Sequence, residues 1–213
     1  MVFHALNRGV GRMKIFSKGR DYEAFEEAVE ETLQLYPMRI LAYCLMPNHW
    51  HFVLWPENDG DLSAFLQRLT NTHTQRWQRA KNKVGYGHLY QGRFKSFPVE
   101  TDDHFYTVVR YVERNALRAN LVETSGAWRW NSLWRHLHKA TSPLLSKWPL
   151  PRPRRWSELV DEPQTEVEVA AIRRCIQRGC PYGGSDWVSQ TAEALGLQST
   201  LRPRGRPRQA ANE

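Results

Sequence analysis

The distribution of apolar and polar residues along the chain predicts four strands. Residues 39–46 and 49–55 are nearly continuous apolar runs, which is typical of strands buried on both faces. Pro47-Asn48 between them predicts a tight turn, so these two strands are expected to form an antiparallel hairpin. A further strand is predicted at residues 2–6, and another at about residues 94–99.

Three helices are predicted between and after these strands. Asp21 caps the first, in which apolar side chains recur at helical spacing until Pro37 ends it. The second covers about residues 62–81, and the third is capped by Asp102 or Asp103. The order strand, helix, two strands, helix, strand, helix predicts an α+β fold, a ferredoxin-like antiparallel sheet with helices on one face.

The composition changes after the third helix. Residues 1–138 are expected to form the main domain, and residues 139–164 a linker, because they are rich in proline and basic side chains. Residues 165–213 are expected to form a helical and basic C-terminal extension that binds DNA, with a short helix at about residues 165–178.

Charge indicates the kind of partner. The 213 residues carry 30 Lys and Arg against 22 Asp and Glu, a formal charge of +8, which favours a polyanion such as nucleic acid. The nine Trp and eight Tyr could stack on unpaired bases, although core packing is the commoner use of any single Trp.

The cysteines and the apolar runs bear on the location of the protein. The three cysteines are an odd number without CxxC spacing, which argues against a disulfide framework and a cysteine zinc site. The longest apolar runs are too short to span a bilayer, and no signal-peptide pattern opens the chain. The expected location is the cytoplasm, in association with the nucleoid.

Two histidines interrupt the strand predicted at residues 49–55. Because residues i and i+2 of a strand point to the same face, His49 and His51 should present two imidazoles side by side while Trp50 faces the helices. Neutral imidazoles in this arrangement can chelate a divalent metal. A chance pair of structural histidines is the alternative.

The third helix offers two further polar groups. Tyr111 and Asn115 are four residues apart and should share one helical face. Tyr106 is a rival nucleophile, but it lies about 140° around the helix from Tyr111. His73, His88 and His104 are weaker candidates for an additional ligand.

Three ordered motifs resemble those of a known family. His49-Trp50-His51, the segment Tyr111-Val112-Glu113-Arg114-Asn115 and the loop Gln91-Gly92-Arg93-Phe94-Lys95 resemble the single-tyrosine HUH transposases. Over residues 2 to about 138 the opening Phe3-His4-Ala5-Leu6-Asn7-Arg8-Gly9 fits as well, and the tail resembles the branch called REP-associated tyrosine transposases. The chain departs from that family at Ala116, where proline is usual, and in starting several residues later.

The resemblance implies a chemistry for these residues. Tyr111 would attack a phosphodiester of single-stranded DNA to give a 5′-phosphotyrosine, and a 3′-OH would reverse the step to join strands. Mg²⁺ or Mn²⁺ held by His49, His51 and Asn115 would stabilise the charge on the phosphate. The implied substrate is single-stranded DNA with hairpins, such as folded palindromic repeats, and a monomer is favoured over a homodimer.

Several basic side chains are candidates for contacts with the DNA backbone. Arg204 and Arg206 lie in an Arg-Gly-Arg-Pro segment that resembles the core of an AT-hook, although a basic tail has the same composition. The full set is Arg8, Arg12, Arg93, Lys95, Arg114, Arg118, Arg204 and Arg206. For each of them a solvated basic surface is the alternative.

Two other functions are compatible with the sequence. A domesticated protein could keep the fold, bind hairpins and regulate its own locus without cutting DNA. A zinc hydrolase would need three strong ligands and an open water position, and would use the tyrosine only as a helper. A covalent protein–DNA product separates the transposase-like enzyme from both.

Overall fold

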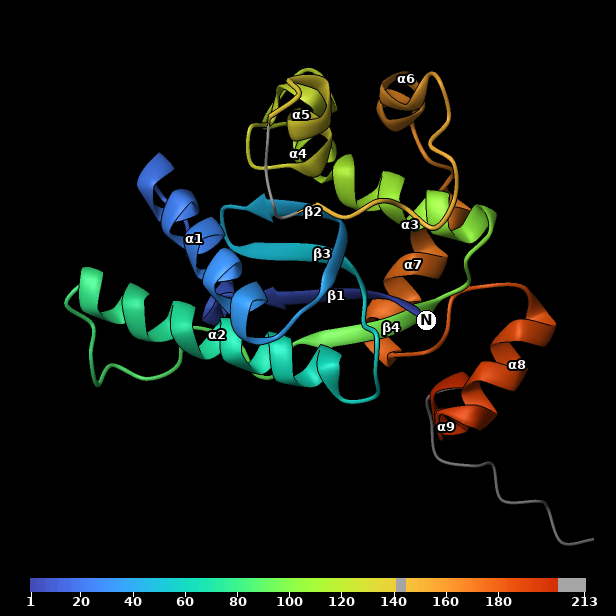
Figure 1. The fold of residues 1–213 in the computed structure, drawn as a ribbon, viewed down its shortest axis with the longest axis horizontal. Helices are drawn as coiled ribbons and strands as arrows, with labels where there is room; N and C mark the ends of the chain where they lie inside the picture. Colours follow the sequence, from blue (N-terminus) through green and yellow to red (C-terminus); the bar gives the residue numbers. More distant parts are fainter. Residues whose placement is uncertain (141–144, 203–213) are drawn as a thin grey trace, which may run out of the picture.

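Four strands form one antiparallel sheet in the computed structural model, which describes residues 1–140 and 145–202 (Figure 1). The sheet order is β2-β3-β1-β4, the ferredoxin-like arrangement predicted from the order of elements. The strands are β1 (Val2–Arg8), β2 (Arg39–Met46), β3 (His49–Trp55) and β4 (Lys95–Val99). The predicted hairpin is present, with Pro47 and Asn48 as its turn.

Two long helices cover one face of this sheet. They are α1 (Gly19–Leu35) and α2 (Asp61–Ala80), and their apolar sides pack on Tyr43, Trp50 and Phe52. A short 3₁₀ helix, η1 (Val10–Arg12), follows β1. The predicted helix bounds agree with these to within a few residues, because Pro37 ends the first helical pattern and Gly60 begins the second.

The third helix corrects one expectation. α3 (Asp103–Glu113) packs against the opposite face of the sheet, where Phe105 and Val109 meet Val53 and Phe97. Helices therefore lie on both faces and not on one. The physical reason is that β2 and β3 are apolar on both sides, so each side needs cover.

The helix that carries the candidate tyrosine ends earlier than expected. Asp102 caps α3 by accepting a hydrogen bond from the His104 backbone N–H (2.8 Å). The helix stops at Glu113, and a single turn, α4 (Asn115–Arg118), follows Arg114. The short η2 (Ser125–Ala127) then packs against α5 (Ser132–Leu137), which lies beside β2.

The segment expected to be a linker packs against the sheet domain over its described residues. Trp148 and Trp156 are buried, and the Trp148 indole donates a hydrogen bond to the Leu41 carbonyl (2.7 Å). This part of the chain includes α6 (Trp156–Asp161), which contacts α3. Two buried indoles thus hold part of the predicted linker against the sheet.

The C-terminal extension begins with the predicted helix. α7 (Glu166–Arg178) has a capping box between Thr165 and Glu168 and ends at Gly179, whose φ of 73° is readily adopted by glycine. It packs against β4, and α8 (Ser185–Ala194) and α9 (Gln198–Leu201) follow beyond it (Figure 1). Across the described residues, no helix combines the length and apolar character needed to cross a membrane.

Candidate active site

The histidine pair lies on the α3 side of the sheet. His51 is opposite Leu6 of β1 and Cys44 of β2, while His49 is opposite Arg8. The two ring centroids are 4.9 Å apart. Trp50 points to the other face and is fully buried beneath α1 and α2. The strand period thus brings the two imidazoles side by side on a rigid element.

Each imidazole has a hydrogen-bond partner at its Nδ1. His49 Nδ1 lies 2.6 Å from Asn48 Oδ1, and His51 Nδ1 lies 2.8 Å from His4 Nε2. These contacts orient the rings and leave Nε2 of both without a hydrogen-bond partner among the described residues. Histidine ligands of metals commonly have this arrangement, with one ring nitrogen held by a second protein group. The donor set therefore fits a divalent metal.

Burial keeps both histidines neutral. It lowers the pKa of His49 to about 3, with the nearby Arg8 and Arg118 adding to the effect. The pKa of His51 is also well below its usual value, first because of burial and then because of the neighbouring His49, His4, Arg118 and Arg8. Only a neutral imidazole has a free lone pair, so the pair can serve as ligands well below neutral pH.

Tyr111 and Asn115 join the histidines at one cavity of about 360 Å³. The Tyr111 ring lies edge-on to His51 with centroids 5.9 Å apart. Asn115 follows one turn later, and its Nδ2 lies 3.4 Å from the Tyr111 carbonyl, which leaves Oδ1 without a hydrogen-bond partner among the described residues. The break after Glu113 therefore does not separate the tyrosine from the amide.

The rival tyrosine lies elsewhere. The Tyr106 hydroxyl donates to the Pro151 carbonyl (2.6 Å), and its ring packs near Trp148 and Trp156. For the hydroxyl of Tyr111, no hydrogen bond occurs among residues 1–140 and 145–202. Of the two phenols on α3, Tyr111 is therefore the one available for chemistry.

Cations surround the tyrosine. The Arg118 guanidinium carbon lies 4.0 Å from the centre of the Tyr111 ring, and its Nη2 donates to the Tyr111 carbonyl (3.1 Å). The cavity is lined by Leu6, Arg8, His49, His51, Gln91, Lys95, Tyr111, Asn115, Arg118, Arg173, Ile176 and Gln177. None of these lining residues is acidic, so the site favours an anion.

Two of these cations have unsatisfied donors. Arg118 Nη1 and Arg8 Nε are buried and have no hydrogen-bond partner among the described residues. Burial lowers the pKa of Arg118, yet a guanidinium keeps its charge in proteins. Buried donors without partners are costly, and the oxygens of a phosphate would satisfy them.

Comparison with known proteins shows the family to which the chain belongs. A family model described as "Transposase IS200 like" matches residues 1–115, more than half of the chain. The chain belongs to the IS200-like transposases. This confirms, at the level of the family, the resemblance drawn from the three sequence motifs.

Two similar proteins are described more specifically, as REP-associated tyrosine transposases. A candidate REP-associated tyrosine transposase of Haemophilus influenzae is 24% identical over 127 residues, which cover 56% of this chain and 72% of that protein. A solved structure of a REP-associated tyrosine transposase bound to a REP hairpin has a TM-score of 0.54 at 17% identity. It covers 78% of this chain and 92% of that one, and the likeness is one of fold.

The transposase chain has a second hollow beside the first. It has a volume of about 900 Å³ and lies between α2 and the loop 87–94. Arg93 lines this groove and not the tyrosine cavity, while Gln91 lines both. His88, a weaker ligand candidate, also lies here. The remaining lining is mostly neutral and polar, with Ser63, Gln67, Thr70, Asn71, Thr74 and Gln78 on one side of α2.

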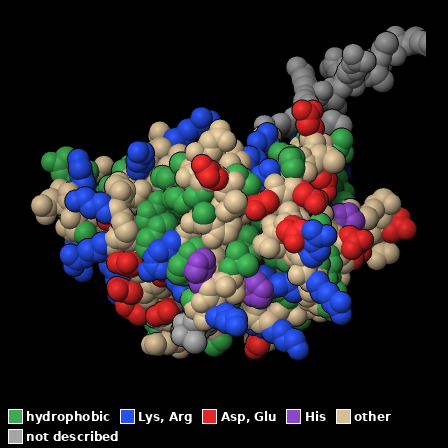
Figure 2. All heavy atoms as spheres, turned by 90° about the horizontal axis from the view of Figure 1, so that it is seen from above, with side chains coloured by type: hydrophobic (Ala, Val, Ile, Leu, Met, Phe, Trp, Pro, Cys, Tyr) green, Lys and Arg blue, Asp and Glu red, His purple; other side chains and the backbone are tan. Residues whose placement is uncertain are grey.

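Other predicted site residues are not brought to the cavity. Arg12 is exposed in η1, and Arg114 donates to the Glu162 carbonyl at the end of α6 (3.1 Å). His73 is buried on the other side of the sheet, with its Nδ1 2.6 Å from the Tyr90 hydroxyl. Arg204 and Arg206 lie outside the described residues. On the face shown in Figure 2, basic and acidic side chains are interspersed.

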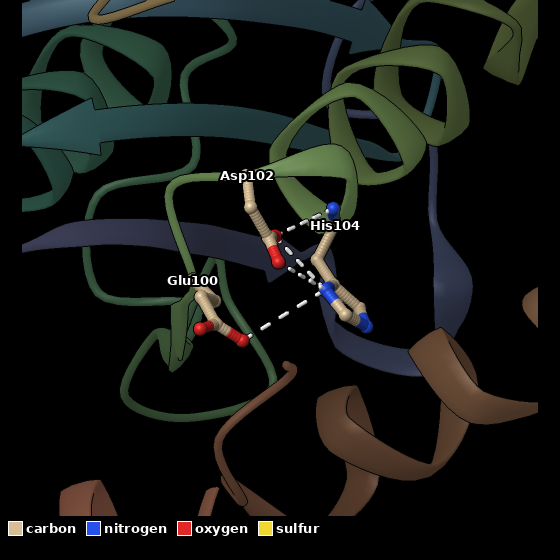
Figure 3. A group of neighbouring side chains, drawn as sticks. All are labelled: Glu100, Asp102 and His104. Carbon is tan, nitrogen blue, oxygen red and sulfur yellow. Dashed lines mark hydrogen bonds and ion pairs between the residues drawn. The ribbon is translucent and has the colours of Figure 1, made fainter. Parts of the chain in front are cut away.

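A different group of side chains could also hold a metal by donor type. Glu100, Asp102 and His104 lie at the start of α3 with donor atoms within 4.8 Å of one another (Figure 3). The carboxylate oxygens that could bind a metal already accept hydrogen bonds, since Asp102 caps α3 and Glu100 accepts from the Gly184 N–H (2.7 Å). The group lies roughly 10 Å along the helix from Tyr111. It is a weaker candidate than the histidine pair.

Sequence reasoning missed four residues at or behind the cavity. His4 and Gln91 come from β1 and from the loop before β4, and Arg173 and Gln177 come from α7. The strand period does place His4 on the same face as Arg8, which was the available signal. For α7 no local signal exists, because the packing of this helix beside β4 brings it to the site.

Proposed function

We propose that this transposase is a metal-dependent endonuclease and strand transferase that cuts single-stranded DNA through a 5′-phosphotyrosine at Tyr111. The observation that carries the proposal is the meeting of Tyr111, Asn115 and the two histidines at one cavity without acidic groups. This is the arrangement of nucleophile, ligands and cations that phosphoryl transfer requires.

The covalent step exchanges one phosphoester for another. The Tyr111 oxygen attacks the phosphorus, the bond from phosphorus to the 3′ oxygen breaks, and that oxygen leaves as a 3′-OH after taking up a proton. The phenolic proton is lost to solvent. Attack by a 3′-OH on the phosphotyrosine reverses the exchange and joins two strands, so no ATP is needed.

Different side chains would bind the phosphate and the metal. Arg118 and Arg8 would bind the phosphate oxygens, because each has a buried donor without a partner. Lys95 adds a cation at the same cavity. His49 Nε2, His51 Nε2 and Asn115 Oδ1 would hold Mg²⁺ or Mn²⁺, which would stabilise charge on the phosphate. The Arg118 guanidinium over the Tyr111 ring would also stabilise the phenolate as it forms.

Hairpin DNA is the proposed substrate. The solved structure with the same fold is described as bound to a REP hairpin. The tyrosine cavity would hold the backbone at the cut, and the mostly neutral groove next to it would receive bases of the unpaired strand. Tyr111 and the histidines come from one chain, which supports action as a monomer.

The decisive experiment traps the covalent product. Oligonucleotides from the flanks of the gene, containing a hairpin and labelled at the 3′ end, are incubated with the full chain and Mg²⁺ or Mn²⁺ and run on a denaturing gel. We expect a labelled protein band with the wild type, because the tyrosine keeps the 5′-phosphate of the 3′ fragment. A 5′ label should appear only on a released fragment ending in 3′-OH.

Two tyrosine variants make the assignment specific. Tyr111→Phe should abolish the adduct, whereas Tyr106→Phe, on the same helix, should retain it because Tyr106 hydrogen-bonds to Pro151 away from the cavity. Hairpin binding without any adduct or cut in the wild type would instead support the non-cleaving regulator. An adduct that survives in Tyr111→Phe would exclude this residue as the nucleophile.

A further inference from the structure

A third histidine lies behind the metal-binding pair. His4 of β1 is fully buried and its Nε2 lies 2.8 Å from His51 Nδ1. We propose that His4 is a positioning residue, which turns the His51 ring toward the cavity and accepts a hydrogen bond from its Nδ1–H, so that His51 Nε2 is free to bind metal. This inference rests on the proposed metal role of His49 and His51.

The hydrogen bond between His4 Nε2 and His51 Nδ1 contains one proton. His4 and His51 are both buried, and their two ring nitrogens lie 2.8 Å apart, so one of them donates a hydrogen bond and the other accepts it. A neutral imidazole has one N–H and one lone pair. Either His51 donates to His4, or His4 donates to His51.

Only one of these two arrangements permits metal binding. If His51 donates from Nδ1, its Nε2 presents a lone pair to the cavity. If His4 donates instead, the proton of His51 is on Nε2 and blocks the ligand. Metal binding at His51 therefore requires His4 to act as the acceptor, with its own proton on Nδ1.

The surroundings of His4 indicate that it is retained for this contact. His4 Nδ1 is buried without a hydrogen-bond partner among the described residues, and the ring packs against Phe97 with centroids 4.8 Å apart. An apolar side chain would satisfy such surroundings better. His73, another buried histidine with a hydrogen bond, has its contact on the far side of the sheet, with Tyr90.

Affinity for Mn²⁺ tests the proposal without relying on DNA cleavage. Titration of the metal-free full chain, followed by the EPR signal of free Mn²⁺, would compare wild type with His4→Phe, His4→Leu and His4→Gln. Loss of a second group behind a ligand typically weakens binding 10–100-fold, and we expect about that loss in the two apolar variants. His4→Gln should restore most of the affinity, because its amide oxygen can accept where Nε2 does.

Two controls separate positioning from a general structural role. His73→Phe removes a buried histidine of the same kind that does not touch His51, and it should keep the wild-type affinity. Melting of the metal-free proteins should show both apolar His4 variants folded. In the wild type, ¹⁵N spectra of the imidazoles with Zn²⁺ as a diamagnetic probe should show His51 protonated at Nδ1.

The outcomes distinguish this inference from the proposed function. Wild-type Mn²⁺ affinity in the folded apolar variants, an equal loss in His73→Phe, or protonation of metal-bound His51 at Nε2 would each overturn the role of His4 alone. An affinity that is unchanged by His51→Ala would overturn the metal assignment itself, and with it the proposed function.

Discussion

His73 shows how burial of one side chain makes the stability of the whole chain depend on pH. It lies on the buried side of α2, where its ring packs against Phe16 and Phe25, and burial lowers its pKa from the usual 6.5 to about 3. Below pH 6.5 the unfolded chain binds a proton there that the folded chain does not. The free energy of unfolding should therefore fall with decreasing pH between about 6.5 and 3, by up to about 1.4 kcal/mol per pH unit for this residue.

A substitution isolates this contribution. In His73→Asn the amide oxygen can still accept from the Tyr90 hydroxyl, as Nδ1 does, but it cannot take up a proton. Urea denaturation of both proteins between pH 7 and pH 4 should give a slope of unfolding free energy against pH that is smaller in the variant by about one proton. Parallel curves would show that His73 does not stay neutral in the folded chain.

The predictability of each site residue depends on how local its signal is. His49 with His51, and Tyr111 with Asn115, were predicted because the periods of strand and helix alone place each pair on one face. His4 and Arg173 were not, because their places depend on strand register and on where α7 packs. Arg114 was assigned to DNA from its charge, and its contact with Glu162 could not be foreseen from sequence.

At the scale of elements, α2 and the start of β4 are expected to contribute differently to DNA binding. The groove side of α2 has neutral side chains such as Gln67 and Asn71, which can hydrogen-bond base edges, whereas Lys95 lies at the tyrosine cavity. Gln67→Ala or Asn71→Ala should reduce discrimination among bases flanking the hairpin by about 1–3 kcal/mol. Lys95→Ala should weaken binding to all sequences and lower the salt slope by about 0.7.

Binding isotherms for a panel of hairpins with varied flanks, at several salt concentrations, would measure both effects. Gln75→Ala is the matched control, because Gln75 is exposed on the same helix but does not line the groove. A uniform loss of affinity in the Gln67 and Asn71 variants, without any change in preference, would contradict base reading by α2.

Helices and strands could be predicted where local turn and cap residues define them. Their placement could not be predicted where it depends on tertiary packing. The β2–β3 hairpin and α7 have clear turn and cap residues, and their bounds matched. The side of the sheet that α3 covers has no local signature, because an apolar helix face fits either side. For residues 145–164 the sequence predicted a linker from its proline and basic content. The burial of Trp148 and Trp156 could not be predicted, because it depends on how this segment packs in the fold.

For the molecule as a whole, residues of the predicted linker contact the helix that carries the tyrosine. Trp156 donates from its indole nitrogen to the buried carboxylate of Glu113 (2.7 Å), two residues after Tyr111. Ser132 donates to the other oxygen of that carboxylate (2.6 Å). Burial raises the pKa of Glu113, so these donors stabilise a group that is costly to bury charged. The end of α3, which carries Tyr111, is thus stabilised by Ser132 and Trp156, which come later in the chain.

A chain ending at residue 138 should therefore fail to fold stably, although its composition predicted a domain boundary there. It would expose the apolar side of α3 and remove a donor from Glu113. A chain ending at Arg202 keeps all of these contacts and is the control, and urea denaturation should give it the wild-type midpoint. In the full chain, Trp156→Ala should cost about 3–5 kcal/mol, and Trp134→Ala clearly less, because Trp134 is only partly buried. A cooperative transition of the 138-residue chain near the wild-type midpoint would mean that the sheet and α3 are stable without their C-terminal cover.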